Sequence, residues 1–407
     1  MVSSTGPENV KSSSPQTTSK AVGVPPGDYR LVGWGMDATG RKLIDEICQI
    51  AGYTPSSTYA QYVMPFKDLN PTARKRHNIK VANTGKFRVL KDSKTNKMLK
   101  TKSEVSALTD FLTWLESVKG DAVDGIILVY HEPRKVIPAM LCESLKKYNL
   151  LDKFNQIVKG FANGFNIAEA KCTGTVNTFS LRTLSRVLLD KDEQLCNAVD
   201  RARLALQIVQ HLSDGEEVTK GIEASGRGDS DATAKGTIEL IREFVQPTHV
   251  EIEELAELKL VLQRQNGLQP IFGPLLRVRR DRQYASPLRR LLAEAGIDYK
   301  LLQEAWTNQK KEGLEKLIIE KVIAATPKDV QDLLDLLECH FDPEKIPKFR
   351  AEQEKRDVKK GSPKSTETKD NSKTDSSETE SPDTTTAGSP LKEKIESENV
   401  KAEIAAN

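Results

Sequence analysis

The sequence has few of the features that would place it in a membrane or in an oxidising compartment. No apolar run reaches the roughly 18–20 residues that a membrane-spanning helix needs, so we expect no membrane partner. The first twenty residues lack the apolar centre of a secretory signal peptide. The chain has five cysteines and no CxxC pair, which favours reduced thiols in a cytoplasmic protein over disulfides or zinc sites.

The chain also lacks a strong charge of one sign. Its formal net charge is +3 over 407 residues, so only local basic clusters can attract a polyanion. Hydrophobic residues make up 37% and charged residues 29% of the chain, which permits folded cores together with disordered segments. We expect such segments at both ends, where Ser, Thr and Pro are abundant: an arm over residues 1–27 and a tail over residues 347–407.

Two regions of different pattern lie between these ends. Residues 28–265 alternate short apolar runs with amphipathic stretches, which predicts an α/β domain with a mixed sheet flanked by helices. We expect strands at 31–34, 62–66 and 124–131, a hairpin within 80–100, helices at 104–118, 137–151 and 237–262, and a loop at 213–233. Residues 268–346 carry only short helical patterns, which predict a small all-α domain.

Three segments resemble the sequence motifs of two-metal exonucleases of the four-acid class. The motif Asp-x-Glu-Thr-Thr-Gly follows a buried strand in these enzymes, and Gly35-Met36-Asp37-Ala38-Thr39-Gly40 follows the strand at 31–34. The second motif, His-Asn-x-x-Phe-Asp, corresponds to a segment with His131 and Glu132 that has Val136 at its Asp position. The third, His-x-Ala-x-x-Asp-Ala, corresponds to a segment with Cys196, Ala198, Arg201 and Ala202.

The replacements remove the groups that this chemistry needs. Two-metal hydrolysis requires carboxylate ligands, and Gly35, Val136 and Arg201 cannot supply them. We therefore predict no metal, no cofactor and no catalytic residue. Two alternatives remain open. In the first, these residues are purely structural. In the second, an unconventional metal site assembles from Asp37, Glu132 and either Asp200 or Asp231. Asp231 and Ala232 give an alternative third motif, with Gly226 at the position of its His.

Longer segments resemble the insect Exuperantia family. They are "YRLVGWGMDATGRKLIDEICQIAGYTP", "QYVMPFKDLNPTARKRH", "DGIILVYHEPRKVIPAMLCESLKKYNLL", "FSLRTLSRVLL" and "AWTNQKKEGLEKL…LLDLLECHFDP", in this order over residues 28–345. The resemblance implies an inactive exonuclease-like domain with a ribonuclease-H-like fold, followed by a sterile-alpha-motif-like (SAM-like) domain. It also implies self-association as a homodimer and RNA binding in the localisation of maternal messenger RNA in the oocyte.

Two basic clusters are candidates for RNA binding, because arginine grips phosphates and stacks on bases. One is Arg74, Lys75 and Arg76, in a predicted loop. The other is Arg277, Arg279, Arg280, Arg282, Arg289 and Arg290, with Tyr284 among them. Either cluster can instead be a solvated face. No RNP aromatic box, GXXG clamp or zinc knuckle is present, so we expect recognition of RNA shape and backbone.

These observations predict an RNA-binding pseudonuclease that acts as an adaptor. Its expected partners are untranslated regions of messenger RNA, a second copy of the chain, and components of cytoplasmic ribonucleoprotein particles. An active metal-dependent 3′–5′ exonuclease and a protein-only scaffold that uses the helical domain are the alternatives. Turnover of a phosphodiester separates the enzyme from the other two, and salt-sensitive RNA binding separates the adaptor from the scaffold.

Overall fold

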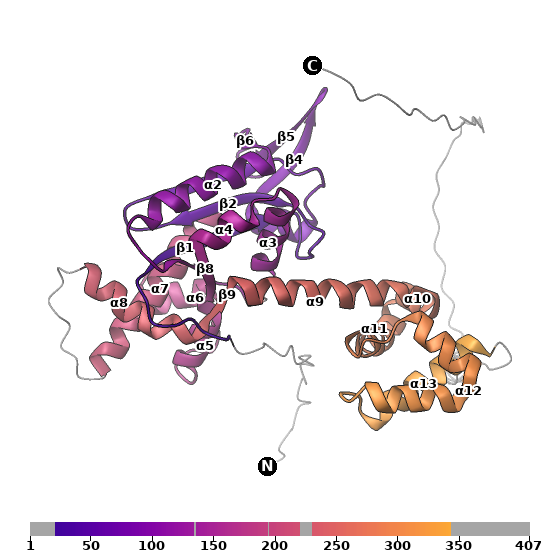
Figure 1. The fold of residues 1–407 in the computed structure, drawn as a ribbon. Helices are drawn as coiled ribbons and strands as arrows, with labels where there is room; N and C mark the ends of the chain where they lie inside the picture. Colours follow the sequence, from indigo (N-terminus) through magenta and orange to yellow (C-terminus); the bar gives the residue numbers. More distant parts are fainter. Residues whose placement is uncertain (1–20, 134–135, 194, 220–229, 343–407) are drawn as a thin grey trace, which may run out of the picture. The chain divides into compact units, whose positions relative to one another are not determined.

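The computed structural model describes residues 21–133, 136–193, 195–219 and 230–342 (Figure 1). The predicted tail at 347–407 and residues 1–20 of the predicted arm lie outside this description. The prediction of an arm was wrong for its last residues: the backbone N–H of Gly23 donates to the carbonyl of Val245 at 2.9 Å, and that of Val24 to Arg242 at 3.0 Å. This short segment is therefore held against the folded domain by backbone hydrogen bonds.

A seven-stranded sheet organises the first domain, in the order β6-β3-β2-β1-β7-β8-β9. Strand β1 is parallel to β7, and β7 is parallel to β8, whereas β2 runs antiparallel to β1. The carboxyl ends of the three central strands therefore lie at one edge of the sheet. The strands are β1 (Tyr29–Ala38), β2 (Ile47–Tyr53), β3 (Thr58–Val63), β6 (Thr101–Lys102), β7 (Gly125–Tyr130), β8 (Val158–Asn163) and β9 (Val245–Pro247).

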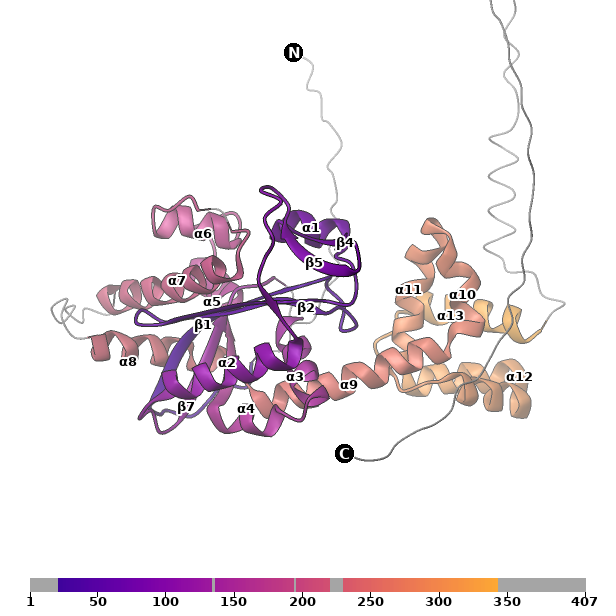
Figure 2. The ribbon, with the colours of Figure 1, turned by 90° about the horizontal axis from the view of Figure 1, so that it is seen from above.

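Both faces of this sheet are buried, which explains the near-continuous apolar run in β7. Successive side chains alternate between the faces: Trp34 and Leu128 belong to one core, Leu31 and Ile127 to the other. Figure 2 shows α2 and α7 on opposite sides of the strands. The first core includes side chains of α2 (Glu104–Lys119), α3 (Ile137–Lys147) and α4 (Leu151–Ile157); the second includes those of α5 (Gly164–Cys172), α7 (Ala198–Thr219) and α8 (Ser230–Ile241).

A small hairpin stands beside the sheet, as the sequence predicted. It consists of β4 (Ile79–Thr84) and β5 (Phe87–Asp92). The preceding cluster at 73–77 was predicted as a loop, and this was wrong: it lies in helix α1 (Pro71–His77). The Asn70 side chain accepts a hydrogen bond from the Ala73 N–H, and Pro71 occupies the first helical position. Such a cap with a leading proline favours helix even over two turns.

Three other predicted boundaries were wrong. The strand expected at 62–66 ends at Val63, because Pro65 follows. The loop expected at 213–233 is helical at both ends, in α7 and α8, and its residues 220–229 lie outside the description. The single helix expected at 237–262 is divided into the end of α8, the short helix η1 (Arg242–Phe244), the edge strand β9 and α9 (Thr248–Gly267). Apolar spacing did not reveal a three-residue strand.

The predicted all-α region is formed by α10 (Gln269–Arg277), α11 (Arg279–Glu294), α12 (Tyr299–Lys321) and α13 (Pro327–Phe341). Helix α12 is interrupted at Gln309 and Lys310, where Lys310 has φ 51°. Thr326 and Asp329 form a capping box at the start of α13. Among the described helices, none is both long enough and apolar enough to span a bilayer. All five cysteines are free thiols, as predicted.

Candidate functional site

The three motif segments meet at the carboxyl edge of the central strands. Asp37 is near the end of β1, and His131 and Glu132 directly follow β7, which runs parallel to β1. Arg201 lies in the first turn of α7, which packs on β1. Open α/β sheets bind ligands at this edge. The three segments therefore lie close together in the folded chain.

Asp37 is bound by two basic side chains. Its carboxylate accepts a hydrogen bond from Nη2 of Arg201 and lies 2.7 Å from Nδ1 of His77, and only 1% of the residue is exposed. Nη1 of Arg201 also donates to the carbonyl of Leu195 at 2.8 Å. Burial alone would raise the pKa of Asp37. The charge of Arg201 and the hydrogen bond from His77 lower it by more than burial raises it, so the pKa of Asp37 is below its usual value. Asp37 is thus an ionised, paired side chain.

Helix α7 also occupies the space in which a second carboxylate would stand. A Cβ atom added to Gly35 would lie 2.4 Å from the carbonyl oxygen of Ala198, and one added to Gly33 would lie 2.2 Å from that of Ala202. The two glycines therefore let the backbone of α7 approach β1 closely. Sequence reasoning identified Gly35 as a missing ligand. Sequence reasoning missed this close packing of α7 on β1. The signal for it is that Gly33 and Gly35 lie two residues apart, on the same face of the strand.

The polar side chains of the second motif segment also have partners within the fold. Glu132 forms an ion pair with Arg76 of α1. Nε2 of His131 lies 2.8 Å from the carbonyl of Phe179, and burial lowers the pKa of His131 to about 4. At neutral pH His131 is therefore uncharged and donates this hydrogen bond. Val136, the residue at the predicted Asp position, immediately precedes α3 and packs against the core.

The other proposed ligands do not complete a metal site. Asp200 lies 3.4 Å from Nη2 of Arg203. Asp231 and Ala232 lie in α8, not in a loop, and Gly226 falls outside the described residues. Within the described ranges, no group of three or more His, Cys, Asp or Glu side chains is placed to hold an ion.

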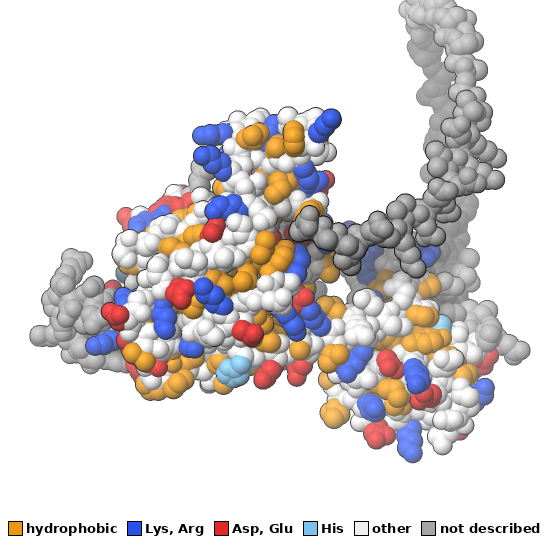
Figure 3. Space-filling view, turned by 45° about the horizontal axis from the view of Figure 1, so that its top comes forward, with side chains coloured by type: hydrophobic (Ala, Val, Ile, Leu, Met, Phe, Trp, Pro, Cys, Tyr) orange, Lys and Arg blue, Asp and Glu red, His pale blue; other side chains and the backbone are white. Residues whose placement is uncertain are grey.

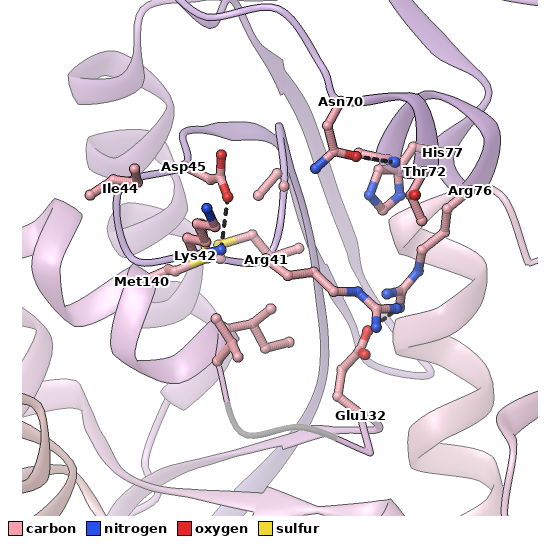
Figure 4. A pocket seen from close by; sticks show the side chains of 16 residues that line it. Arg41, Lys42, Ile44, Asp45, Asn70, Thr72, Arg76, His77, Glu132 and Met140 are labelled. Carbon is pink, nitrogen blue, oxygen red and sulfur yellow. Dashed lines mark hydrogen bonds and ion pairs between the residues drawn. The ribbon is translucent and has the colours of Figure 1, made fainter. Parts of the chain in front are cut away.

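Two adjoining hollows open at this edge. The smaller, of about 450 Å³, lies on the α3 side and includes Met36 and Met140 in its wall (Figure 4). The larger, of about 920 Å³, is lined by residues of α5, α6 (Leu181–Leu188) and α7 together with Cys196. Arg41, Arg76 and Glu132 line both hollows. The edge is therefore hollowed and lined by both charged and apolar side chains, although its carboxylates Asp37 and Glu132 are paired.

Comparisons with known proteins agree with this architecture. Residues 29–188 match the Exuperantia RNAse H-like domain, and residues 269–340 match the Exuperantia SAM-like domain. The maternal protein exuperantia of Drosophila virilis is 35% identical over 358 residues, covering 79% of this chain and 72% of that protein. Its Drosophila melanogaster counterpart is 35% identical over 386 residues, covering 80% and 71%. The chain belongs to the Exuperantia family.

Family membership confirms the predicted fold class of this Exuperantia chain. It has a ribonuclease-H-like domain with a mixed sheet, followed by a SAM-like helical domain. The predicted boundaries at residues 265 and 268 fall at the end of α9 and the start of α10. Helix α9 contacts α3, to which it is joined by the ion pair of Lys259 with Glu143, and it also contacts α10 and α11.

The structure separates Arg74 and Lys75 of the first basic cluster from its third member, Arg76, which lies with the neighbouring His77. Arg74 and Lys75 are exposed on the outer face of α1. Arg76 and His77 instead point toward the sheet edge, where they pair with Glu132 and Asp37. Sequence reasoning did not assign this role, and the helical spacing after the Asn70 cap is the signal that would have separated the two faces.

The second cluster is divided as well. Arg277, Arg279 and Arg280 are exposed where α10 meets α11. Arg282 donates to the carbonyl of Leu276 at 2.8 Å, within the same junction. The remaining members have structural partners: Arg289 is half-buried beside Gln265, Arg290 pairs with Glu294 at 2.6 Å, and Tyr284 interacts with Asp332.

Proposed function

We propose that this protein is a catalytically inactive exonuclease homologue that binds RNA and acts as a cytoplasmic adaptor in messenger RNA localisation. The observation that carries the proposal is the pairing of Asp37 with Arg201 and His77. A fixed guanidinium charge at this position repels a divalent cation and occupies the carboxylate that would bind it. The name of its Drosophila relatives, maternal protein exuperantia, supports a role in the oocyte.

The cation-lined edge of the sheet and the exposed arginines at the α10–α11 junction support RNA as the partner. Both sites present guanidinium groups, which form bidentate contacts with phosphates. On the face shown in Figure 3, Lys and Arg alternate with Asp and Glu instead of forming a field of one sign. RNA attraction in our proposal therefore depends on these two local sites and not on the net charge of +3.

The enzymatic part of the proposal is tested with the full chain and end-labelled single-stranded RNA in Mg²⁺ or Mn²⁺. We expect no shortening of the RNA and binding that weakens as salt rises. Cleavage that disappears in both Asp37→Asn and Glu132→Gln would contradict the pseudonuclease. Two variants are needed because Asp37 is also bound to its structural partners.

The partner assignments are tested separately. Absence of RNA binding at low salt would favour the protein-only scaffold over the adaptor. We also propose that the chain forms a homodimer and associates with ribonucleoprotein components, on the strength of the family to which it belongs. Light scattering of the full chain at micromolar concentration should give twice the mass of one chain, and a single-chain mass would exclude the dimer at that concentration.

A further inference from the structure

The two hollows at the sheet edge adjoin each other at one ion pair. Arg76 and Glu132 belong to the walls of both hollows and are paired with each other. Arg41 also belongs to both walls, and Figure 4 shows its side chain extended from the β1–β2 loop toward this pair. Two guanidinium groups and one carboxylate therefore line this junction, and only Arg76 is paired with the carboxylate. This junction carries an excess positive charge.

The other charges of the larger hollow are largely balanced by partners. Arg182 lies 3.1 Å from Asp192, Arg201 is bound to Asp37, and Glu193 is paired with Arg203. Because these charges are already paired, we expect an anion to be attracted most strongly to the junction. Arg41 makes no ion pair with any described residue, so its guanidinium is available to a ligand.

The walls on either side of the junction each include an apolar part. Phe165 and Phe179 line the larger hollow in an edge-to-face contact with ring centroids 6.0 Å apart, and both are half-buried. Met36, Ile137 and Met140 line the smaller hollow. Aromatic and thioether surfaces suit flat heteroaromatic rings. Volumes of about 920 and 450 Å³ fall in the range of small-ligand sites.

We propose that the two hollows bind two consecutive nucleotides of single-stranded RNA, one base in each, with the linking phosphate held by Arg41 and Arg76. The order of features is apolar wall, cationic junction, apolar wall, which matches base, phosphate, base. Paired bases cannot enter, because in a duplex they are stacked and their edges are occupied. This inference rests on the proposed RNA binding and assigns part of it to a site separate from the α10–α11 junction.

The test uses the full chain and a fluorescent twelve-residue oligouridylate, with binding followed by anisotropy. Arg41→Glu replaces an exposed side chain, and Arg30→Glu at the opposite end of β1 makes the same charge change on another exposed position. We expect Arg41→Glu to weaken binding about tenfold, since a charge-assisted contact is lost. Arg30→Glu should stay within about twofold of wild type. Both variants should unfold at the wild-type urea concentration.

Three further measurements separate the possible ligands. The dinucleotide UpU should displace the oligouridylate at lower concentration than UMP, and equal displacement would overturn the two-nucleotide arrangement. A blunt RNA duplex should bind Arg41→Glu and wild type alike. Photo-crosslinks from adjacent 4-thiouridines should fall on the peptides that contain Phe179 and Met140.

The failures of the two proposals are distinguishable. If wild type binds the oligouridylate but Arg41→Glu binds as well as Arg30→Glu, the hollows are not the site, and the RNA-binding function stands. Crosslinks confined to residues 277–290 would lead to the same conclusion. If wild type binds no RNA at any salt concentration, both the inference and the proposed function are wrong.

Discussion

Two groups of arginines in this protein have opposite surroundings. At the sheet edge, Arg201 is almost completely buried and bound to Asp37, and Arg76 is bound to Glu132. At the junction of α10 and α11, Arg279 and Arg280 are exposed. Each arginine of the first group is paired with a carboxylate of the same domain. The second leaves its charge available to solvent and to ligands.

The comparison teaches that a basic residue in a segment resembling an exonuclease motif need not bind nucleic acid. The charge of Arg201 is used inside the protein, where removing one partner leaves an uncompensated buried ion. An exposed arginine contributes little to stability, so its charge is free to act in binding. The two groups should therefore differ in stability, in pH response and in salt dependence.

The largest expected effect is on stability at the sheet edge. Arg201→Leu should lower the free energy of unfolding by about 3–5 kcal/mol, because Asp37 stays buried without its cation. Arg279→Leu should change it by less than about 0.5 kcal/mol. Urea unfolding followed by tryptophan fluorescence measures both. Equal stability of the two variants would remove the distinction between the groups.

A double variant identifies the cause of this loss. Asp37→Leu combined with Arg201→Met removes both charges and keeps apolar bulk, so it should recover much of the stability lost in Arg201→Leu. If the double variant is less stable than Arg201→Leu, the carboxylate is not the unsatisfied group, and the loss comes from packing of α7.

The second effect is a dependence of stability on pH, to which His131 at the sheet edge should contribute and the exposed arginines should not. Burial depresses the pKa of His131 to about 4 in the folded protein, below the ordinary value near 6.5. The unfolded chain therefore binds more protons between these values, and stability falls as the pH drops from about 6.5 to 4, by roughly 3 kcal/mol in total. The lowered pKa of Asp37 acts in the same direction at lower pH.

Unfolding measured between pH 7 and pH 4.5 tests this dependence. His131→Gln retains a side-chain N–H for the carbonyl of Phe179 but has no group that titrates in this range. Its stability should fall less steeply than that of wild type. A parallel loss in both proteins would show that another group titrates.

The third effect concerns the packing of α7 on β1. Gly35→Ala should cost about 1–3 kcal/mol, because its Cβ meets the carbonyl of Ala198. Gly215→Ala is the matched control: it lies in the same helix with no atom near its added Cβ, and should stabilise by about 0.5–1 kcal/mol. Gly35→Asp should be destabilised too, and Mg²⁺ should not raise its melting temperature. Stabilisation by Mg²⁺ would show that one carboxylate restores a metal site.

The contrast also marks how far the sequence predicts this structure. Periodicity located β1, β7 and α2, because their apolar residues follow a single regular pattern. It missed β9 and helix α1, since a three-residue edge strand and a two-turn helix contain too few residues to establish a period. Motif order brought Asp37 and Arg201 together, but His77 came from a segment with no motif. Pairing between distant residues is a property of the folded packing and leaves no local signal.

The smallest effect on stability should be the clearest test of RNA binding at the helical junction. Arg279→Glu with Arg280→Glu changes two exposed side chains, so the melting temperature should stay within about 1 °C of wild type. If both contact phosphates, the slope of log binding constant against log salt should decrease in magnitude by about 1.4, at roughly 0.7 per contact with a single strand. Arg289→Glu is an instructive contrast, because this half-buried side chain contacts Gln265 and burial lowers its pKa. It should lower stability before it alters the salt slope. If the double variant keeps the wild-type slope, the junction is a solvated face, and RNA contacts must be sought at Arg41 and Arg76.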